Sequence, residues 1–252
     1  MTERPLTGRR IVITRSPKQA KVLAEKLEKL GGIPLVFPVI RFEPLFPPQL
    51  ADALARLASF DWLVFTSVNA VQFFLNQVDL VPESLPKIAA VGSATADQLE
   101  RLGFAIDFMP DSFTGEHLAR GLGDLMGQEI LLPRAKIGRP DIVTLLQEQG
   151  AVVHDIPLYD TVTATPTAEM WAQLQAGFDL LTFTSPSSVR NFVKIVRRDS
   201  PELLPAISHC PTAVIGPVTA DAVTQQNLKA PVVPTEYTIQ GLIDVSIHLF
   251  SQ

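Results

Sequence analysis

The sequence predicts an α/β fold in which mainly parallel sheets are covered by helices. Three observations lead to this prediction: short apolar segments alternate with amphipathic segments of helical period, the apolar segments show no two-residue alternation, and the same order of segments occurs twice. Strands buried on both faces have this continuous apolar character, and the helices between them supply the right-handed crossovers that parallel strands need.

An internal repeat divides the chain into two copies of roughly 120 residues. FDWLVFTSVNAVQFFL at 60–75 and FDLLTFTSPSSVRNFV at 178–193 are identical at eight of sixteen positions, with an offset of 118 residues. Further matches pair residues 89–97 with 213–221 and residues 9–15 with 128–134. Each copy is therefore expected to form one set of alternating strands and helices.

The elements of the first copy follow from this alternation. Strands are predicted at 11–14, 33–37, 62–65, 88–91 and 106–109. Helices are predicted at 17–30, near 48–58, and at 69–76, 94–102 and 114–122. Pro17 in the first turn and Gly31 after the last turn mark the ends of the first helix. The second copy is expected to repeat this order.

Two extended segments follow the second strand of each copy. Their Val, Ile, Phe, Tyr and Thr residues, bounded by proline, favour strands that could pair as a two-stranded ladder. In that case the domains are swapped halves rather than tandem copies, and the sequence alone leaves both arrangements open. The swapped arrangement has one domain of residues 1–37 plus 164–252, a second domain of residues 45–157, and linker strands at 38–44 and 158–163.

Composition limits the class of protein. With 252 residues, 46% of them hydrophobic, and a formal charge of -5, the chain is neither disordered nor fibrous. Its one cysteine, Cys210, excludes an intramolecular disulfide, and its four histidines are too far apart for the usual zinc motifs, so we expect no metal.

Charge and hydropathy also limit the ligands and the compartment. The first ten residues lack the apolar core of a signal peptide, and no stretch approaches the roughly 18 apolar residues of a membrane span. We therefore expect a cytoplasmic protein that binds neither nucleic acid nor membranes. Because the chain is acidic, any anionic ligand must be bound by local donors.

The duplicated F-D-x-L-x-F-T-S segment places hydroxyl and amide side chains where a strand ends and a helix begins. Ligands bind at this edge of open α/β sheets, and the helix N-terminus adds backbone N–H donors for an anion. The alternative is that these residues only cap helices. The candidate binding residues are Thr66, Ser67 and Asn69 in the first copy and Thr184, Ser185, Ser187 and Ser188 in the second.

A second duplicated segment reads V-G-S-A-T-A-D and I-G-P-V-T-A-D. Glycine after a strand permits close approach to a ligand, although tight packing of strand against helix explains it equally well. Neither copy matches a dinucleotide or phosphate-loop motif, so a nucleotide cofactor is disfavoured. The candidate binding residues here are Gly92, Ser93, Thr95, Gly216 and Thr219.

Cations follow the first strand of each copy. Arg15 and Arg134 occupy equivalent positions, and Lys136 and Arg139 add positive charge near the second. Guanidinium groups suit carboxylate ligands, and surface salt bridges are the alternative. The repeated Asp61 and Asp179 precede their strands at the opposite edge and are interpreted as structural turn residues.

The catalytic residue sets of common hydrolases are not recognisable in the sequence. It contains no legible Ser-His-Asp or Cys-His set and no paired carboxylates of the glycosidase kind at a sheet edge. An enzyme with this sequence would therefore act mainly by positioning its substrate.

With these residues in hand, the chain resembles the uroporphyrinogen-III synthase family of tetrapyrrole (heme, porphyrin) biosynthesis. The resemblance rests on the order and spacing of I-V-I-T-R, the duplicated F-T-S and V-G or I-G segments, and P-L-Y-D-T at 157–161. It implies two flavodoxin-like α/β domains with the first discontinuous, a two-stranded connector, an active cleft between the domains, and neither cofactor nor metal. It therefore favours the swapped arrangement.

The resemblance also implies the reaction. Enzymes of this family are hydro-lyases that cyclise hydroxymethylbilane, a linear tetrapyrrole with eight carboxylates, and invert its last ring through azafulvene and spiro intermediates. A linker tyrosine is the favoured acid or base there, and it matches Tyr159, with a substrate carboxylate as the competitor. The first copy has Ile40 at the aligned position.

Partners and rival functions complete the expectations. We expect a monomer, and the resemblance allows transient contact with the preceding pathway enzyme. One alternative is a two-lobed intracellular module that senses a small anion. Another is a catalytically silent relative with a regulatory role.

Overall fold

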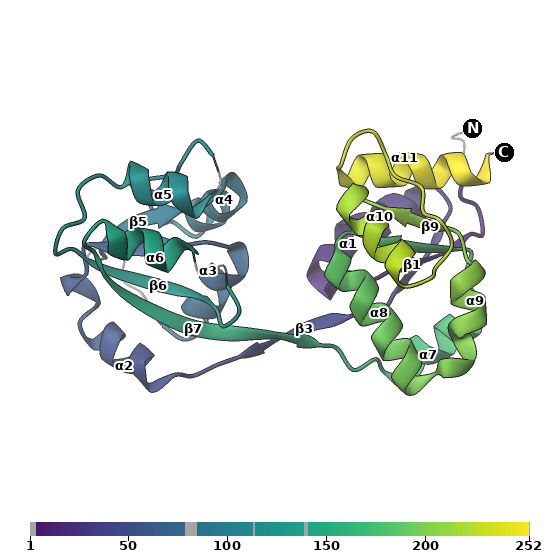
Figure 1. The fold of residues 1–252 in the computed structure, drawn as a ribbon, viewed down its shortest axis with the longest axis horizontal. Helices are drawn as coiled ribbons and strands as arrows, with labels where there is room; N and C mark the ends of the chain where they lie inside the picture. Colours follow the sequence, from purple (N-terminus) through teal and green to yellow (C-terminus); the bar gives the residue numbers. More distant parts are fainter. Residues whose placement is uncertain (1–3, 79–84, 113, 139–140, 252) are drawn as a thin grey trace. The chain divides into compact units, whose positions relative to one another are not determined.

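Two mainly parallel sheets organise the chain in a computed structural model that describes residues 4–78, 85–112, 114–138 and 141–251. Each sheet belongs to a separate unit (Figure 1). Unit 1 comprises Met1–Arg41 and Val162–Gln252, and unit 2 comprises Phe42–Thr161. The predicted α/β class is confirmed, because helices alternate with parallel strands in both units.

The sheet of unit 1 has four parallel strands in the order β2-β1-β8-β9. Strand β1 of the first sequence copy pairs with β8 of the second, with Ile11 opposite Leu180. Segments far apart in the sequence therefore share one sheet. The strands are β1 (Arg10–Ile13), β2 (Ile33–Val36), β8 (Leu180–Phe183) and β9 (Thr212–Val214).

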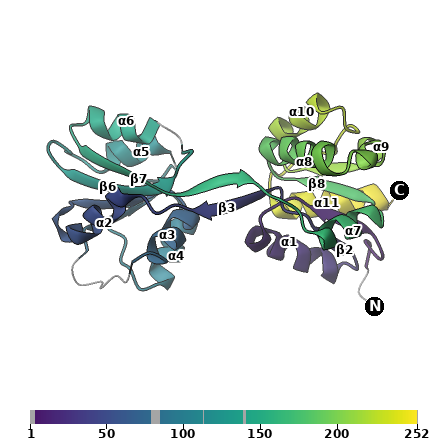
Figure 2. The same cartoon turned by 90° about the horizontal axis from the view of Figure 1, so that it is seen from below.

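Helices cover both faces of this sheet, as Figure 2 shows. The core on one face includes Leu23 of α1 and Leu242 of α11. The other core includes Leu174 of α7, Phe192 of α8 and Val223 of α10. The helices are α1 (Pro17–Lys29), α7 (Ala168–Gln175), α8 (Pro186–Asp199), α9 (Leu204–His209), α10 (Pro217–Gln225) and α11 (Ile239–Phe250), with a 3-10 turn at Pro201–Leu203.

The sheet of unit 2 has five strands in the order β3-β7-β6-β4-β5. Strand β3 pairs with β7, and the Leu45 N–H donates to the Leu158 carbonyl while the Ala164 N–H donates to the Val39 carbonyl, so the two run antiparallel. The predicted pairing of the extended segments is present. The strands are β3 (Ile40–Pro44), β4 (Trp62–Phe65), β5 (Lys87–Ala90), β6 (Glu129–Ala135) and β7 (Val152–Thr163).

Two groups of helices pack on this second sheet. Leu50 of α2, Phe74 of α3 and Leu99 of α4 belong to the core on one face. Leu118 of α5 and Leu146 of α6 belong to the core on the other. The helices are α2 (Pro48–Ala55), α3 (Val68–Leu75), α4 (Ser93–Arg101), α5 (Gly115–Gly121) and α6 (Asp141–Glu148), with a 3-10 turn at Leu57–Ser59.

The strand predicted at 106–109 is wrong. This segment contributes a single bridge, between Ala89 and Phe108. The carboxylate of Asp107 accepts the Ile88 N–H at 2.7 Å, where a continuing ladder would have used a backbone carbonyl. The Ala90 N–H still donates to the Phe108 carbonyl at 3.0 Å, so the segment pairs with β5 through one bridge and does not form a strand.

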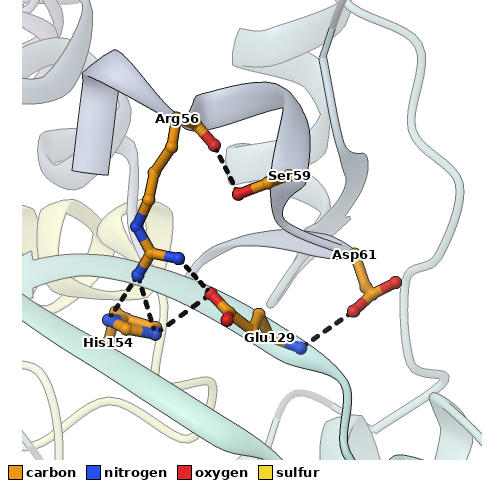
Figure 3. Close-up of polar contacts among 5 residues, drawn as sticks. All are labelled: Arg56, Ser59, Asp61, Glu129 and His154. Atoms are coloured by element: carbon orange, nitrogen blue, oxygen red, sulfur yellow. Dashed lines mark hydrogen bonds and ion pairs between the residues drawn. The ribbon is translucent and has the colours of Figure 1, made fainter. Parts of the chain in front are cut away.

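The repeated aspartates are structural, as predicted. The Glu129 N–H donates to the Asp61 carboxylate at 2.8 Å, which joins the loop before β4 to the start of β6 (Figure 3). The Arg10 N–H donates to the Asp179 carboxylate at 2.7 Å and joins β1 to the loop before β8 in the same way. Each aspartate thus ties neighbouring strands together at the amino edge of its sheet.

Cys210 lies 6% exposed in unit 1, and burial raises the pKa of its thiol to about 12. Because only the thiolate reacts, we expect a thiol reagent at pH 8 to modify the native protein roughly a thousandfold more slowly than the unfolded chain. Following the reaction with and without urea tests this. Equal rates in the two conditions would show that Cys210 is accessible in the native state.

The structure contributes one finding on membranes. Within the residues described, no helix combines the length and the apolar character needed to cross a bilayer.

Candidate functional site

A pocket of about 800 Å³ opens at the carboxyl edge of the unit 2 sheet. This is the edge at which open α/β sheets bind ligands. The lining comes from the ends of β4, β5 and β6, from β7 and from the first turns of α5 and α6. Its residues are Thr66, Ser67, Val91, Thr114, Gly115, Glu116, Arg134, Ala135, Gly138, Asp141, Ile142, Leu145 and Tyr159.

Tyr159 of β7 is held rigidly in the wall of this pocket. Its side chain is 5% exposed, and its ring stacks on Phe73 with 4.7 Å between ring centroids. Phe42 meets the same ring edge to face at 5.6 Å. Two aromatic contacts therefore fix the ring of a residue that lines the pocket.

Ser67 is the hydrogen-bond partner of that hydroxyl, with 3.2 Å between Ser67 Oγ and Tyr159 Oη. Ser67 also caps α3, because its Oγ accepts the Ala70 N–H at 3.1 Å. With an acceptor site of Oγ already used, Ser67 can donate its own proton to Tyr159. The phenol proton is then available to a ligand in the pocket.

The cations predicted in the second copy are largely paired. Arg134 makes two hydrogen bonds to Asp155, at 2.6 Å from Nε and 2.5 Å from Nη2, and these bonds raise the pKa of its guanidinium. Lys136 lies 3.1 Å from Asp160. Arg134 lines the pocket, Lys136 is not among its lining residues, and Arg139 lies outside the described residues.

Two acidic residues of the pocket were not predicted. Glu116 and Asp141 lie in the first turns of α5 and α6, positions where carboxylates stabilise a helix. Glu116 also pairs with Arg120 at 2.7 Å. The only sequence feature that could have indicated these two residues is an acidic side chain in the first turn of a helix. That feature is common in helices and does not identify a binding site. The pocket lining therefore contains carboxylates and hydroxyls as well as the guanidinium of Arg134, so it is not purely cationic.

The other candidate binding residues of the first copy lie in different places. Thr66 lines the pocket, whereas Asn69 does not. Gly92 has a φ of +93° before α4, a backbone conformation that favours glycine. Gly92 and the exposed Ser93 are absent from the pocket lining, and Thr95 is 3% exposed within the fold. Thr95 thus fits the packing alternative.

The second-copy hydroxyls lie at the equivalent edge of unit 1. Ser185 caps α8 in a capping box with Ser188, and its Oγ lies 3.0 Å from Ser187 Oγ. Thr184 is half-buried directly after β8. Ser185 and Ser188 therefore serve as helix caps, the alternative raised by the sequence.

The second-copy glycine segment differs from the first in its backbone. Gly216 is extended, with a φ of -174°, so its conformation does not require glycine. A Cβ built there would lie 3.5 Å from the Tyr237 ring, an ordinary packing distance. Thr219 is buried at 3% exposure, like its equivalent in the first copy.

A smaller pocket of about 320 Å³ lies between α2 and β7 of unit 2 and includes Arg56 and His154. Its polar groups bind one another: Arg56 Nη1 is 2.6 Å from Glu129 Oε2, and His154 Nε2 is 3.4 Å from the same oxygen (Figure 3). Arg56 also covers the Phe60 ring at 4.8 Å. This cluster stabilises the amino edge of the sheet.

Comparison with known proteins places these features in a family. The family described as uroporphyrinogen-III synthase HemD matches residues 21–244. The chain belongs to the uroporphyrinogen-III synthase family. The resemblance inferred from the duplicated segments is thereby confirmed.

Relatives in this family are similar over nearly the whole chain. The uroporphyrinogen-III synthase of Synechococcus elongatus is 33% identical over 96% of this chain and 96% of that protein. The porphyrin biosynthesis protein HemD of Ruminiclostridium josui is also 33% identical, over 98% of this chain. This chain spans about half the length (50%) of the Ruminiclostridium protein.

Solved structures in the family share the fold. Uroporphyrinogen-III synthetase from Helicobacter pylori aligns with a TM-score of 0.64 and 20% identity, over 96% of this chain and 99% of that chain. A mutant uroporphyrinogen III synthase from Thermus thermophilus aligns with a TM-score of 0.59 and 22% identity, over 97% and 100%. At these identities the likeness supports the α/β fold of this family member.

Proposed function

We propose that this chain is a uroporphyrinogen-III synthase, a lyase that dehydrates and cyclises hydroxymethylbilane with inversion of the terminal pyrrole ring. The observation that supports this proposal is the placement of Tyr159, in a member of this family, on the wall of a large pocket with its hydroxyl oriented by Ser67. We propose further that it acts in the cytoplasm as a monomer.

The first proposed step is loss of water. Tyr159 donates its proton to the hydroxymethyl oxygen, the carbon–oxygen bond breaks, and the adjacent pyrrole nitrogen supplies the electron pair that forms the azafulvene. General acid assistance of this kind contributes about 10²- to 10⁴-fold. A substrate carboxylate is the competing proton donor.

Ring closure follows from the reactivity of the azafulvene. Its methylene carbon is attacked by the substituted carbon of the terminal ring, which gives a spiro intermediate. The bond that joined this carbon to the neighbouring ring's methylene then breaks and leaves an azafulvene on that ring. The free carbon of the terminal ring attacks this azafulvene, and loss of the proton on that carbon to the Tyr159 phenolate restores the pyrrole. The inverted type III ring results.

Selection of one substrate conformer is the main task of the protein in this mechanism. The linear substrate closes without inversion when it is free, so the site must hold the terminal ring for attack at its substituted carbon and limit access of water to the azafulvene. Glu116 and Asp141 are suited to accept hydrogen bonds from pyrrole N–H groups. The pocket thus offers acceptors for the ring nitrogens and a proton donor for the leaving oxygen.

The test is isomer analysis of the product. We expect the purified protein, given freshly made hydroxymethylbilane, to yield predominantly the type III ring, which is separated from type I by chromatography after oxidation. A buffer control measures spontaneous closure. Only type I product, formed at the buffer rate, would contradict the proposal, and tight binding without turnover would then favour a silent relative or a sensor.

A further inference from the structure

Arg15 of unit 1 is a cation for which the described residues supply no hydrogen-bond partner at Nε. It follows β1 at the carboxyl edge of the sheet, is half-buried, and its Nε is buried. Burial lowers the pKa of its guanidinium. A buried Nε–H that loses its hydration without gaining a hydrogen bond is costly unless a ligand supplies an acceptor.

The equivalent residue of the other copy is in the opposite state. Arg134 is aligned with Arg15 in the repeat, 119 residues later. It lies near the end of β6 and is held by two hydrogen bonds to Asp155. Its side chain is 11% exposed. The two units therefore place the same residue at the same edge, and in one of them the guanidinium is neutralised within the protein.

The difference between the copies is traced to one position. Asp155 lies opposite Leu132 in the ladder between β6 and β7. The same offset of 119 residues leads from these two to Val36 and Ile13, which lie opposite each other in the ladder between β1 and β2. Val36 thus replaces the internal counter-ion, and an isopropyl group offers no acceptor to Arg15.

Hydroxyl donors are available on the next strand. β8 is the neighbour of β1, and Ser185 and Ser187 follow it at the same edge of the sheet. A cation beside neutral donors suits a carboxylate, which accepts hydrogen bonds from both. The substrate of the proposed reaction carries eight such groups.

We propose that Arg15 binds a carboxylate of the tetrapyrrole substrate, whereas Arg134 is bound to Asp155 and holds the wall of the unit 2 pocket. The inference rests on the proposed function, and it assigns different roles to the two members of a duplicated pair. Arg15 is thus a substrate-binding residue and not a participant in proton transfer.

Two variants test this assignment from opposite directions. Arg15→Gln removes the cation, and Val36→Asp leaves Arg15 in place but supplies the internal carboxylate that Asp155 provides in the other copy. Arg198→Gln is the control for loss of one positive charge, since Arg198 is an exposed residue of α8 paired with Asp199. The measurements are KM and kcat for hydroxymethylbilane and the urea midpoint of each variant.

We expect Arg15→Gln and Val36→Asp each to raise KM about tenfold or more, because a hydrogen-bonded charge pair with the substrate is lost, with a smaller change in kcat. Neither should lower the urea midpoint, since Arg15→Gln removes the half-buried cation and Val36→Asp gives it a carboxylate partner. Arg198→Gln should match the wild type. If Arg15→Gln does not fold, Val36→Asp decides alone.

The inference is overturned if the wild type makes the type III ring and either folded variant keeps its KM within twofold. It is also overturned if Arg198→Gln raises KM as much as Arg15→Gln, because net charge would then be the cause. Failure of the proposed function is distinct from both, since the wild type would then make only the type I ring.

Discussion

Replacing Tyr159 by Phe is expected to lower kcat for type III ring formation by about 10²- to 10⁴-fold, with a much smaller change in KM. The substitution removes only the hydroxyl, because a phenylalanine ring keeps the contacts with Phe73 and Phe42. The proton donor for the leaving oxygen is lost while the shape of the pocket is kept. Steady-state kinetics and the affinity for uroporphyrin, measured by fluorescence, separate these effects.

A pair of matched variants tests whether the hydrogen bond from Ser67 to the Tyr159 hydroxyl affects turnover. Ser67→Ala removes the cap of α3 and the partner of Tyr159, whereas Thr238→Ala removes only the cap of α11, where Thr238 accepts the Gly241 N–H at 3.0 Å. Both lose a cap of about 1 kcal/mol. Turnover should fall only in Ser67→Ala. Unchanged turnover in Tyr159→Phe would remove the phenol from the mechanism.

Replacing Asp155 by Asn is expected to destabilise unit 2 by about 2 kcal/mol, below the value for a fully buried pair because Asp155 is 34% exposed. The substitution leaves the guanidinium of Arg134, which is 11% exposed, without its charged partner. The hydrogen bonds to Asp155 raise the pKa of the Arg134 guanidinium, so the stabilisation is fully present at neutral pH and is lost only when the pH rises through that raised pKa.

The two tryptophans allow unit 2 to be followed alone. The chain has 2 tryptophans, Trp62 in unit 2 and Trp171 in unit 1, so Trp171→Phe leaves a fluorescent reporter of unit 2. Urea unfolding in that background measures the effect of Asp155→Asn. The control is Asp199→Asn, which breaks the exposed pair with Arg198 in unit 1 and should leave the transition unchanged. A transition unchanged by Asp155→Asn would show that the pair is not stabilising.

Much of the fold was predictable because its signals are local. Continuous apolar segments marked the buried strands, such as β4 and β8, in which all residues are buried. Thr114 and Thr238, a repeated threonine, turned out to cap α5 and α11. The strand at 106–109 failed because a side chain, Asp107, took the place of a backbone partner, and hydropathy does not report that exchange.

The candidate site was predicted less completely than the fold. Thr66, Ser67 and Arg134 line one pocket, as their positions at a sheet edge suggested, and Tyr159, proposed from the family resemblance, lines the same pocket. Glu116 and Asp141 were missed because an acidic first helical turn is common. The contact between Ser67 and Tyr159 joins residues 92 apart in the chain, which no local pattern reveals.

The sequence by itself determined the α/β class, the duplicated segments and the family, because apolar periodicity, helix caps and motif order are properties of neighbouring residues. Only the tertiary structure decided that β1 pairs with β8, and that Arg134 has a carboxylate partner while the Nε of Arg15 has none among the described residues. The physical reason is that two copies with the same local preferences differ in what lies beside them across a ladder. The guanidinium of Arg134 is hydrogen-bonded to Asp155, whereas the copy that carries Val36 at the equivalent position offers Arg15 no such carboxylate.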